Sequence, residues 1–189
     1  MQKVTKHSIL SFRFIVFLVI ALTACSANSG YAFESQPGRF SVLFPSKPKE
    51  WSKFINTKYG KSTIYAFDVI DGTAAYSVTY LDYPETRAPD DSTAYYDSVR
   101  DEIAGRSGHT LVSESDSQFD ITAGRTLTFE LTTKIAEHGY LKIHLVLVGN
   151  RYYFLGYNEY ISKFNSADAD RFFNSFKMIP NTSKDNLQG

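Results

Sequence analysis

Cysteine is nearly absent from this chain. Cys25 is the single cysteine among 189 residues, and it lies close to the N-terminus. One cysteine cannot form an intrachain disulfide, so the disulfide-stapled class of small secreted domains is excluded. The 165 residues from Cys25 onward are enough for one domain with a substantial apolar interior. We therefore expect a single domain that is stabilised by its core.

The chain also lacks an excess of either charge. It carries 20 basic and 20 acidic residues, and the segment before Cys25 contains three of the basic ones, Lys3, Lys6 and Arg13. The remainder is slightly acidic, which makes it a poor electrostatic partner for phosphate backbones, and we expect no nucleic-acid partner. No polybasic cluster follows Cys25 that would add attraction to an anionic membrane surface.

No hydrophobic run is long enough to cross a membrane. The apolar segment Phe14–Leu22 has nine residues, which span about 14 Å as a helix, against a hydrocarbon core of about 30 Å. Basic residues precede this segment, and Leu-Thr-Ala-Cys, ending at Cys25, follows it directly. This arrangement resembles a secretory signal with a bacterial lipobox. We interpret residues 1–24 as a lipoprotein signal peptide.

Lipid attached to Cys25 would anchor the exported protein to a bacterial membrane, facing the periplasm or the cell exterior. The small polar residues that follow lead us to expect a flexible tether over residues 25–37. An alternative is cleavage by ordinary signal peptidase after Gly30-Tyr31-Ala32, which would release a soluble protein beginning at Phe33. The tail, residues 181–189, is expected to be disordered.

Local catalytic motifs are absent as well. The sequence contains no Gly-x-Ser-x-Gly elbow and no glycine-rich phosphate loop. His138 and His144 are separated by six residues of expected strand, or about 20 Å, so they cannot share one metal ion. We expect no catalytic residue, no metal site and no cofactor. An envelope enzyme whose active site leaves no local motif remains an alternative.

The turn signals are the clearest structural feature that is present. Asp71-Gly72 and Gly149-Asn150 each separate two runs rich in β-branched and aromatic residues, which is typical of two-residue hairpins. The first turn would pair residue 70 with residue 73, and thereby Phe67 with Tyr76. The second would pair residue 148 with residue 151, and thereby Leu147 with Tyr152.

A third turn is expected at residues 137–139. It would place Leu131 opposite Leu145 and Phe129 opposite Leu147, so that three consecutive strands share one apolar face. Further strands are expected over residues 39–45, 50–57 and 110–120.

Two helices are expected to complete the domain. Asp91 or Ser92 can cap a helix that runs to about Ala104, with a narrow apolar stripe formed by Tyr96, Val99 and Ile103. A second helix begins near Ser166, and its apolar residues recur at helical spacing: Ala169, Phe172, Phe173 and Phe176. These elements predict an α+β domain with a largely antiparallel sheet of six to eight strands and at least two helices packed on it.

Three segments resemble bacterial domains of the PsbP/Mog1-like α/β/α sandwich family. They are the opening strand Gly38–Pro45, the hairpin end Tyr80–Pro84 and the closing segment Asp170–Phe176. The resemblance covers most of residues 38–179, and it implies one domain, residues 38–180, that acts as a non-catalytic binding or assembly module. Its partner would be the membrane, reached through the lipid, together with an envelope or membrane protein.

One sheet face is a candidate ligand or partner surface. The expected registers place a polar and aromatic set of side chains on the side away from the apolar face. We select Glu130, Lys142, His144, Tyr153 and Tyr157 as the candidate residues. In a small-molecule or ion carrier, Tyr153 and Tyr157 would line a cavity. The alternatives are that a helix covers this face or that it is an ordinary solvated sheet face.

Overall fold

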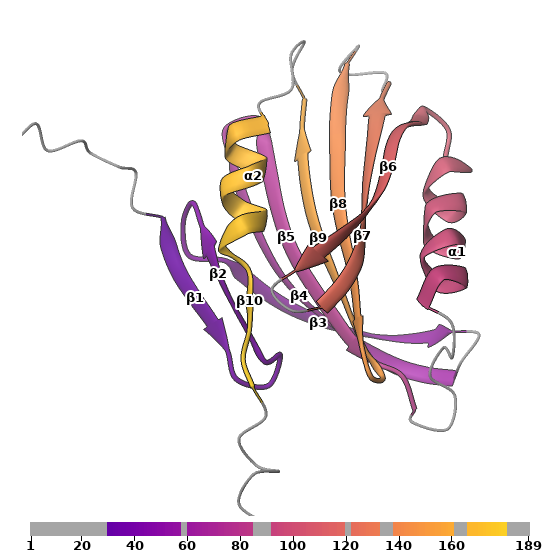
Figure 1. The fold of residues 1–189 in the computed structure, drawn as a ribbon. Coiled ribbons are helices and arrows are strands. Elements are labelled where there is room, and N and C mark those ends of the chain that lie inside the picture. The colour runs from indigo at the N-terminus through magenta and orange to yellow at the C-terminus, as the bar shows by residue number, and fades with distance from the viewer. Residues whose placement is uncertain are drawn as a thin grey trace, which may run out of the picture.

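The computed structural model describes residues 30–57, 60–84, 92–119, 122–132, 138–160 and 166–180. A seven-stranded antiparallel sheet is its central layer, in the order β3-β4-β5-β9-β8-β7-β6 (Figure 1). The strands are β3 (Lys49–Thr57), β4 (Gly60–Asp71), β5 (Ala74–Asp82), β6 (His109–Phe119), β7 (Thr122–Leu131), β8 (Gly139–Val148) and β9 (Arg151–Glu159). The α+β prediction is confirmed.

The first outer layer consists of helix α2 (Ser166–Ser175) and a small three-stranded sheet (Figure 1). The small sheet has the order β1-β2-β10, with β1 (Tyr31–Ser35), β2 (Phe40–Phe44) and β10 (Lys177–Met178). The apolar face expected for α2 is confirmed, because Ala169, Phe172, Phe173 and Phe176 are all buried. They pack with residues of β2, β4, β5, β8 and β9 in one cluster.

The second outer layer is helix α1 (Ser92–Ala104), which packs on the opposite face of the large sheet. Tyr95, Tyr96 and Ile103 are buried against apolar side chains of β7, β8 and β9, while Val99 is only partly buried. Helices on both faces of one sheet make the α/β/α sandwich that was expected.

The hairpin at Gly149-Asn150 has the predicted register, with Leu147 opposite Tyr152. In the hairpin between β4 and β5, Asp71 instead pairs with Ala74, so Gly72 and Thr73 are the central residues. A type I′ turn needs positive φ at both central positions, but among Asp71, Gly72 and Thr73 only Gly72 has it, at 60°. The side chains of both strands still point to the predicted faces of the sheet, because the observed register differs from the predicted register by an even number of residues.

The register predicted for the turn at residues 137–139 is wrong. Leu131 lies opposite Gly139 rather than Leu145, and Phe129 lies opposite Leu141. Strand β8 already begins at Gly139, so that glycine belongs to the sheet and not to the turn. Residues 133–137 lie outside the described part of the chain.

The segment expected to be a flexible tether contains strand β1. Phe33 lies opposite Val42 of β2, and its ring is 4.9 Å from that of Phe67. Burial of this aromatic ring, together with pairing to β2, orders a segment whose small polar residues predicted disorder. Residues 1–29, including Cys25, and residues 181–189 lie outside the described part of the chain.

An arginine ties the small sheet to the large one. Arg151 donates two hydrogen bonds of 2.6 Å to the Asp82 carboxylate and a third, also 2.6 Å, to the Pro37 carbonyl. Its guanidinium lies 4.7 Å from the ring centre of Tyr80. The turn between β1 and β2 is thereby fixed at the end of the large sheet where β5 ends and β9 begins.

We expect Phe172→Ala to lower the free energy of unfolding by about 3–5 kcal/mol, because it opens a cavity between α2 and the sheet. Phe172 is 2% exposed, and its ring lies 5.4 Å from Phe44 and 5.3 Å from Tyr76. Urea denaturation measures the change. Ile70→Ala is the matched control, since Ile70 is 81% exposed, and we expect it to change stability by less than about 0.5 kcal/mol. Similar losses in both variants would contradict the proposed packing of α2.

Candidate functional site: a cleft beside helix α1

The sheet face that was expected to bind a ligand or partner is covered where it carries Tyr153 and Tyr157. Tyr153 and Tyr157 are 1% and 0% exposed, because α2 and β2 pack on them. Tyr153 donates a hydrogen bond of 2.7 Å to the Gly38 carbonyl, and the Tyr157 ring lies 5.1 Å from Tyr76, edge on. These tyrosines contribute to a packed interior and not to an open surface. The alternative that a helix covers this face holds for this part of it.

His144 is part of the same interior. Its ring is stacked on Phe173, with 3.9 Å between ring centres, and lies 4.3 Å from Phe119. Burial lowers the pKa of His144 to about 3, and the nearby positive charge of Lys142 adds to this effect. The imidazole is therefore neutral near pH 7 and acts as an aromatic packing group.

The remaining two candidates make separate surface contacts. Lys142 extends to α2, where its ammonium lies 2.7 Å from the Asp170 carboxylate and 5.6 Å from the ring centre of Phe173. The Glu130 carboxylate lies 3.5 Å from Nδ1 of His138. The five candidate residues thus lie on one side of the sheet, as predicted, but do not converge on a shared open space.

A different feature is open to solvent, on the α1 side of the large sheet. We call it the α1 cleft, and it has a volume of about 520 Å³. Four strands and the helix form its walls. The residues are Ile55, Asn56, Thr57, Ile64, Leu81, Tyr83, Tyr95, Ser98, Val99, Glu102, Ile103, Arg106, Tyr152 and Phe154.

Three buried tyrosines lie deepest in the α1 cleft. The hydroxyls of Tyr83 and Tyr95 are 2.8 Å apart, and the ring of Tyr95 lies 4.9 Å from that of Tyr152, edge on. The hairpin turn positions Tyr83, because Asn150 donates a hydrogen bond to the Tyr83 carbonyl and accepts one from its N–H. Burial raises the pKa of Tyr152 well above its usual range, so its hydroxyl stays protonated.

The walls of the α1 cleft that lie nearer to solvent are aliphatic and aromatic. Ile55, Ile64, Val99 and Phe154 are each only partly buried, which leaves apolar surface in contact with solvent. At the rim, Arg106 donates a hydrogen bond of 3.0 Å to Glu102, one turn earlier on α1. A concave apolar surface with a few polar groups at its edge is suited to binding an apolar or aromatic group.

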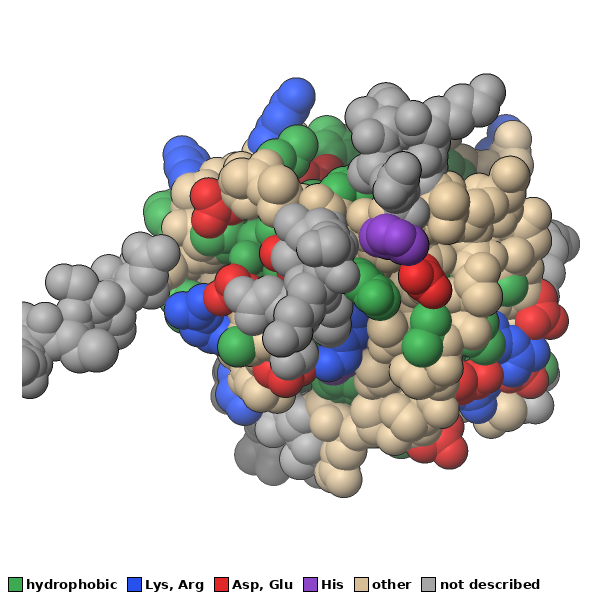
Figure 2. Space-filling view, turned by 90° about the horizontal axis from the view of Figure 1, so that it is seen from above, with side chains coloured by type: hydrophobic (Ala, Val, Ile, Leu, Met, Phe, Trp, Pro, Cys, Tyr) green, Lys and Arg blue, Asp and Glu red, His purple; other side chains and the backbone are tan. Residues whose placement is uncertain are grey.

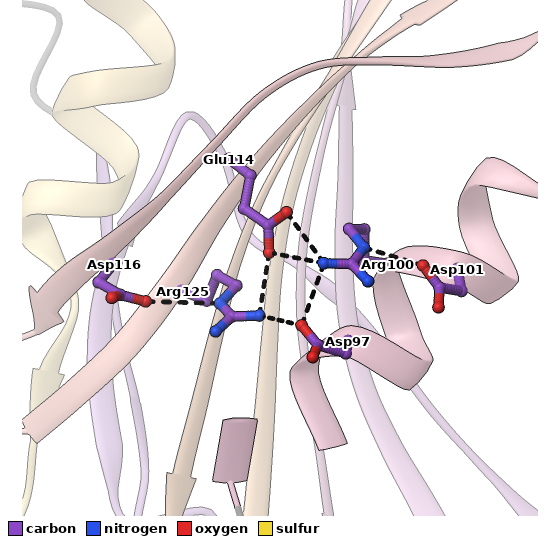
Figure 3. A network of polar contacts seen from close by, with 6 residues as sticks. All are labelled: Asp97, Arg100, Asp101, Glu114, Asp116 and Arg125. Carbon is purple, nitrogen blue, oxygen red and sulfur yellow. Dashed lines mark hydrogen bonds and ion pairs between the residues drawn. The ribbon is translucent and has the colours of Figure 1, made fainter. Parts of the chain in front are cut away.

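An ion-pair network ties α1 to β6 and β7 (Figure 3). Glu114 of β6 lies 2.9 Å from the Arg125 guanidinium of β7 and 3.1 Å from the Arg100 guanidinium of α1. Asp97 of α1 contacts both arginines, at 2.5 Å and 3.1 Å. The side chain of Arg125 is only 10% exposed, so its charge is compensated mainly by these carboxylates.

Tyr96 provides a second attachment for α1. Its hydroxyl accepts a hydrogen bond of 3.0 Å from the Leu147 N–H, and the Arg125 guanidinium lies 5.6 Å from its ring centre. These contacts fix the helix over β6, β7 and β8. The apolar side chains of β3 and β4 that line the cleft, Ile55 and Ile64, are only partly covered, and the cleft is open there.

The rest of the described surface has few features that favour a metal site or a partner whose charges all have one sign. No group of three or more potential metal ligands occurs among the residues that the structure describes. Acidic and basic side chains are interspersed over the end of the molecule that Figure 2 presents. Within the same described segments, no helix is long and apolar enough to span a bilayer.

Sequence reasoning did not find the α1 cleft. The helix itself was expected, and the narrowness of its apolar stripe was the available signal, since such a stripe cannot cover a wide sheet. Recognising the cleft also requires the strand order, which brings Ile55 of β3 and Ile64 of β4 to the same cleft as Phe154 of β9, with β5 between them.

Comparison with solved structures shows a PsbP-like fold. The solution structure of cyanobacterial PsbP from Synechocystis is 13% identical, with a TM-score of 0.50, and the match covers 82% of this chain and 95% of that one. A Bacteroides thetaiotaomicron structure is 12% identical, with a TM-score of 0.47, and the match covers 81% of this chain but only 50% of that one. No protein-family model matches the chain, and neither does any curated sequence.

The burial of His144 predicts a specific pH dependence. Its folded-state pKa of about 3 lies below the unfolded value of about 6.5, so the unfolded state takes up the proton first as the pH falls. The stabilisation from the neutral ring is complete above about pH 6.5 and is lost progressively below it. Between pH 7 and pH 5 we expect a loss of roughly 2 kcal/mol from this residue.

Urea denaturation at the two pH values measures this loss. His144→Phe keeps an aromatic ring between Phe119 and Phe173 and removes the titration, so we expect its stability to decline less. His138→Gln, at an exposed position, is the histidine control. An unchanged pH dependence in His144→Phe would show that the ring is not held neutral.

Proposed function

We propose that this protein is an exported, lipid-anchored, non-catalytic binding or assembly module that recognises a membrane-associated protein through the α1 cleft. The observation that carries the binding role is the cleft itself, with Ile55, Ile64, Val99 and Phe154 partly open to solvent. Apolar concave surface that is left exposed by a folded domain is typical of a recognition site.

The polar groups of the α1 cleft favour binding over catalysis. Glu102 and Arg106 pair with each other at the rim, and the hydroxyls of Tyr83 and Tyr95 bond to each other at the base. Catalytic acids and bases are usually held with pKa values near the working pH in such a cleft. His144 is strongly perturbed, but it lies on the opposite side of the sheet and is packed under α2.

The anchor would hold the domain near the membrane. Strand β1 begins at Tyr31, six residues after Cys25, so the intervening chain can span at most about 20 Å. This distance is short compared with the reach of a long flexible tether, and it favours a partner in or on the same membrane. The ordered strand also argues for cleavage before Cys25, since cleavage before Phe33 would remove Tyr31 and Ala32 from β1.

A second candidate function is that of a small-molecule carrier. The cleft volume of about 520 Å³ falls within the usual range for small-ligand sites. An apolar ligand with an aromatic ring would fit the partly exposed wall formed by Val99 and Phe154.

Intact mass spectrometry of the protein extracted from membranes tests the anchor. We expect a mature chain that begins at Cys25 and carries two or three acyl chains, and we expect Cys25→Ala to lose both the lipid and the membrane association. An unlipidated chain that begins at Phe33 would contradict the anchor and favour the soluble carrier.

Site-specific photocrosslinking tests the cleft. A photoreactive residue at position 99 lines the cleft, while one at position 70 is at an exposed site outside it. We expect position 99 to crosslink one envelope protein, position 70 not to, and the added change Ile64→Glu to reduce the yield at least fivefold. Equal yields from the two positions would contradict recognition through the cleft.

A further inference from the structure

Strand β3 is an open edge of the large sheet. It ends the strand order on one side, and no segment within the described part of the chain pairs with its outer edge. It is nine residues long and mostly exposed. Trp51 is 43% exposed and Phe54 is 80% exposed. Over residues 49–56, an edge strand with these properties presents an edge without a neighbouring described strand, and apolar side chains, to any extended polypeptide.

The opposite edge of the sheet is protected. Strand β6 has a register shift between Leu111 and Ser113, and such a bulge interrupts pairing. It also carries Glu114 and Asp116, and acidic side chains discourage the addition of another strand. The register of β3 with β4 continues without a shift from Lys49 to Thr57. Charged side chains also occur on β3, at Lys49, Glu50 and Lys53, so the uninterrupted register is what distinguishes β3 as the edge that favours pairing.

The open edge is continuous with the α1 cleft. Ile55, Asn56 and Thr57 belong to β3 and also line the cleft. Lys53 pairs with Ile64, which is another cleft residue, so the side chains of Lys53 and Ile64 point to the same face. Since side chains alternate along a strand, Trp51, Lys53 and Ile55 all lie on the cleft side of the sheet.

We infer that β3 is the docking strand for an extended segment of the partner protein, which adds a further strand to the sheet and lays alternate side chains along the wall of the α1 cleft. This inference rests on the proposed function and specifies its mode of recognition. Backbone hydrogen bonds to β3 hold the partner segment, and every second side chain of that segment contacts the wall of the cleft, which gives specificity.

The side chains of β3 define the chemistry of that segment. A carboxylate complements Lys53, and apolar side chains complement Trp51 and Ile55 on either side of it. The partner motif is therefore apolar-x-acidic-x-apolar. The motif is symmetric about its acidic residue. That residue can therefore lie opposite Lys53 whether the added segment runs parallel or antiparallel to β3.

The same side chains disfavour a second copy of this chain as the occupant. Antiparallel pairing of two complete β3 strands places the two Lys53 side chains directly opposite each other at the centre of the interface. Like charges in that arrangement are destabilising. A partner of different sequence avoids this repulsion.

A peptide probe tests the inference with the purified full-length protein in detergent. The probe is a fluorescein-labelled nonapeptide, Thr-Thr-Val-Thr-Glu-Thr-Val-Thr-Thr, and its control carries Lys in place of Glu. Fluorescence anisotropy gives the two affinities. We expect the Glu peptide to bind about threefold more tightly, and we expect Lys53→Glu to reverse the preference. Lys53 is exposed, so this substitution leaves the fold intact.

N-methylated probes test the backbone pairing. Successive N–H groups of a strand point to opposite edges, so methylating one alternate set blocks the donors to β3 and methylating the other set does not. We expect at least a tenfold loss of affinity for one set and less than twofold for the other. Equal losses, or an unchanged preference in Lys53→Glu, would overturn strand addition.

Two further outcomes separate this inference from the proposed function. A partner that crosslinks at position 99 with the same yield in Lys53→Glu would leave the cleft in use and overturn only the role of β3. Concentration-dependent dimers in sedimentation experiments, lost when Phe54 is replaced by Pro, would identify a second copy as the occupant and overturn the inferred partner.

Discussion

A seven-stranded sheet with two apolar faces has to be shielded from water on both, and the described segments provide one helix for each face. Burial of apolar area is the main source of stability for such a sandwich. Helix α2 spans ten residues and is too short to cover its face alone. The small sheet completes that layer, so Phe40, Phe44 and Tyr153 become fully enclosed. Among the described elements, α1 alone covers the other face, which remains partly open.

Arginines fix both covering layers at their borders. Arg151 joins the turn before β2 to the ends of β5 and β9, while Arg125 joins α1 to β6 and β7. Both side chains are only 10% exposed and are paired with carboxylates, so each layer has a defined lateral position. Helix α1 lies over the β6–β8 half of its sheet face. The cleft therefore forms on the same face, toward β3 and β4.

Two local patterns predicted local structure correctly, while the Asp71-Gly72 pattern predicted a hairpin but not its register. The Phe172, Phe173 and Phe176 spacing identified the buried face of α2, because helical periodicity depends only on neighbouring residues. The two-residue turn at Gly149 likewise fixed its hairpin register. The register across residues 133–138 could not be predicted in this way, since the start of β8 depends on pairing with β7 and β9. Strand β1 was missed for the same reason, because it exists through pairing with β2 and contact with Phe67.

The candidate face was assigned to the correct side of the sheet, but its environment was not predictable. Alternation along the strands places His144, Tyr153 and Tyr157 together, and it cannot say which helix covers them. A polar and aromatic face suits burial when its polar atoms find partners, as the Tyr153 hydroxyl does with the Gly38 carbonyl. The uncovered region is instead the more aliphatic one, near Ile55 and Ile64. Exposed apolar surface next to an unpaired strand edge is costly for an isolated domain, and an extended partner segment would relieve both costs at once.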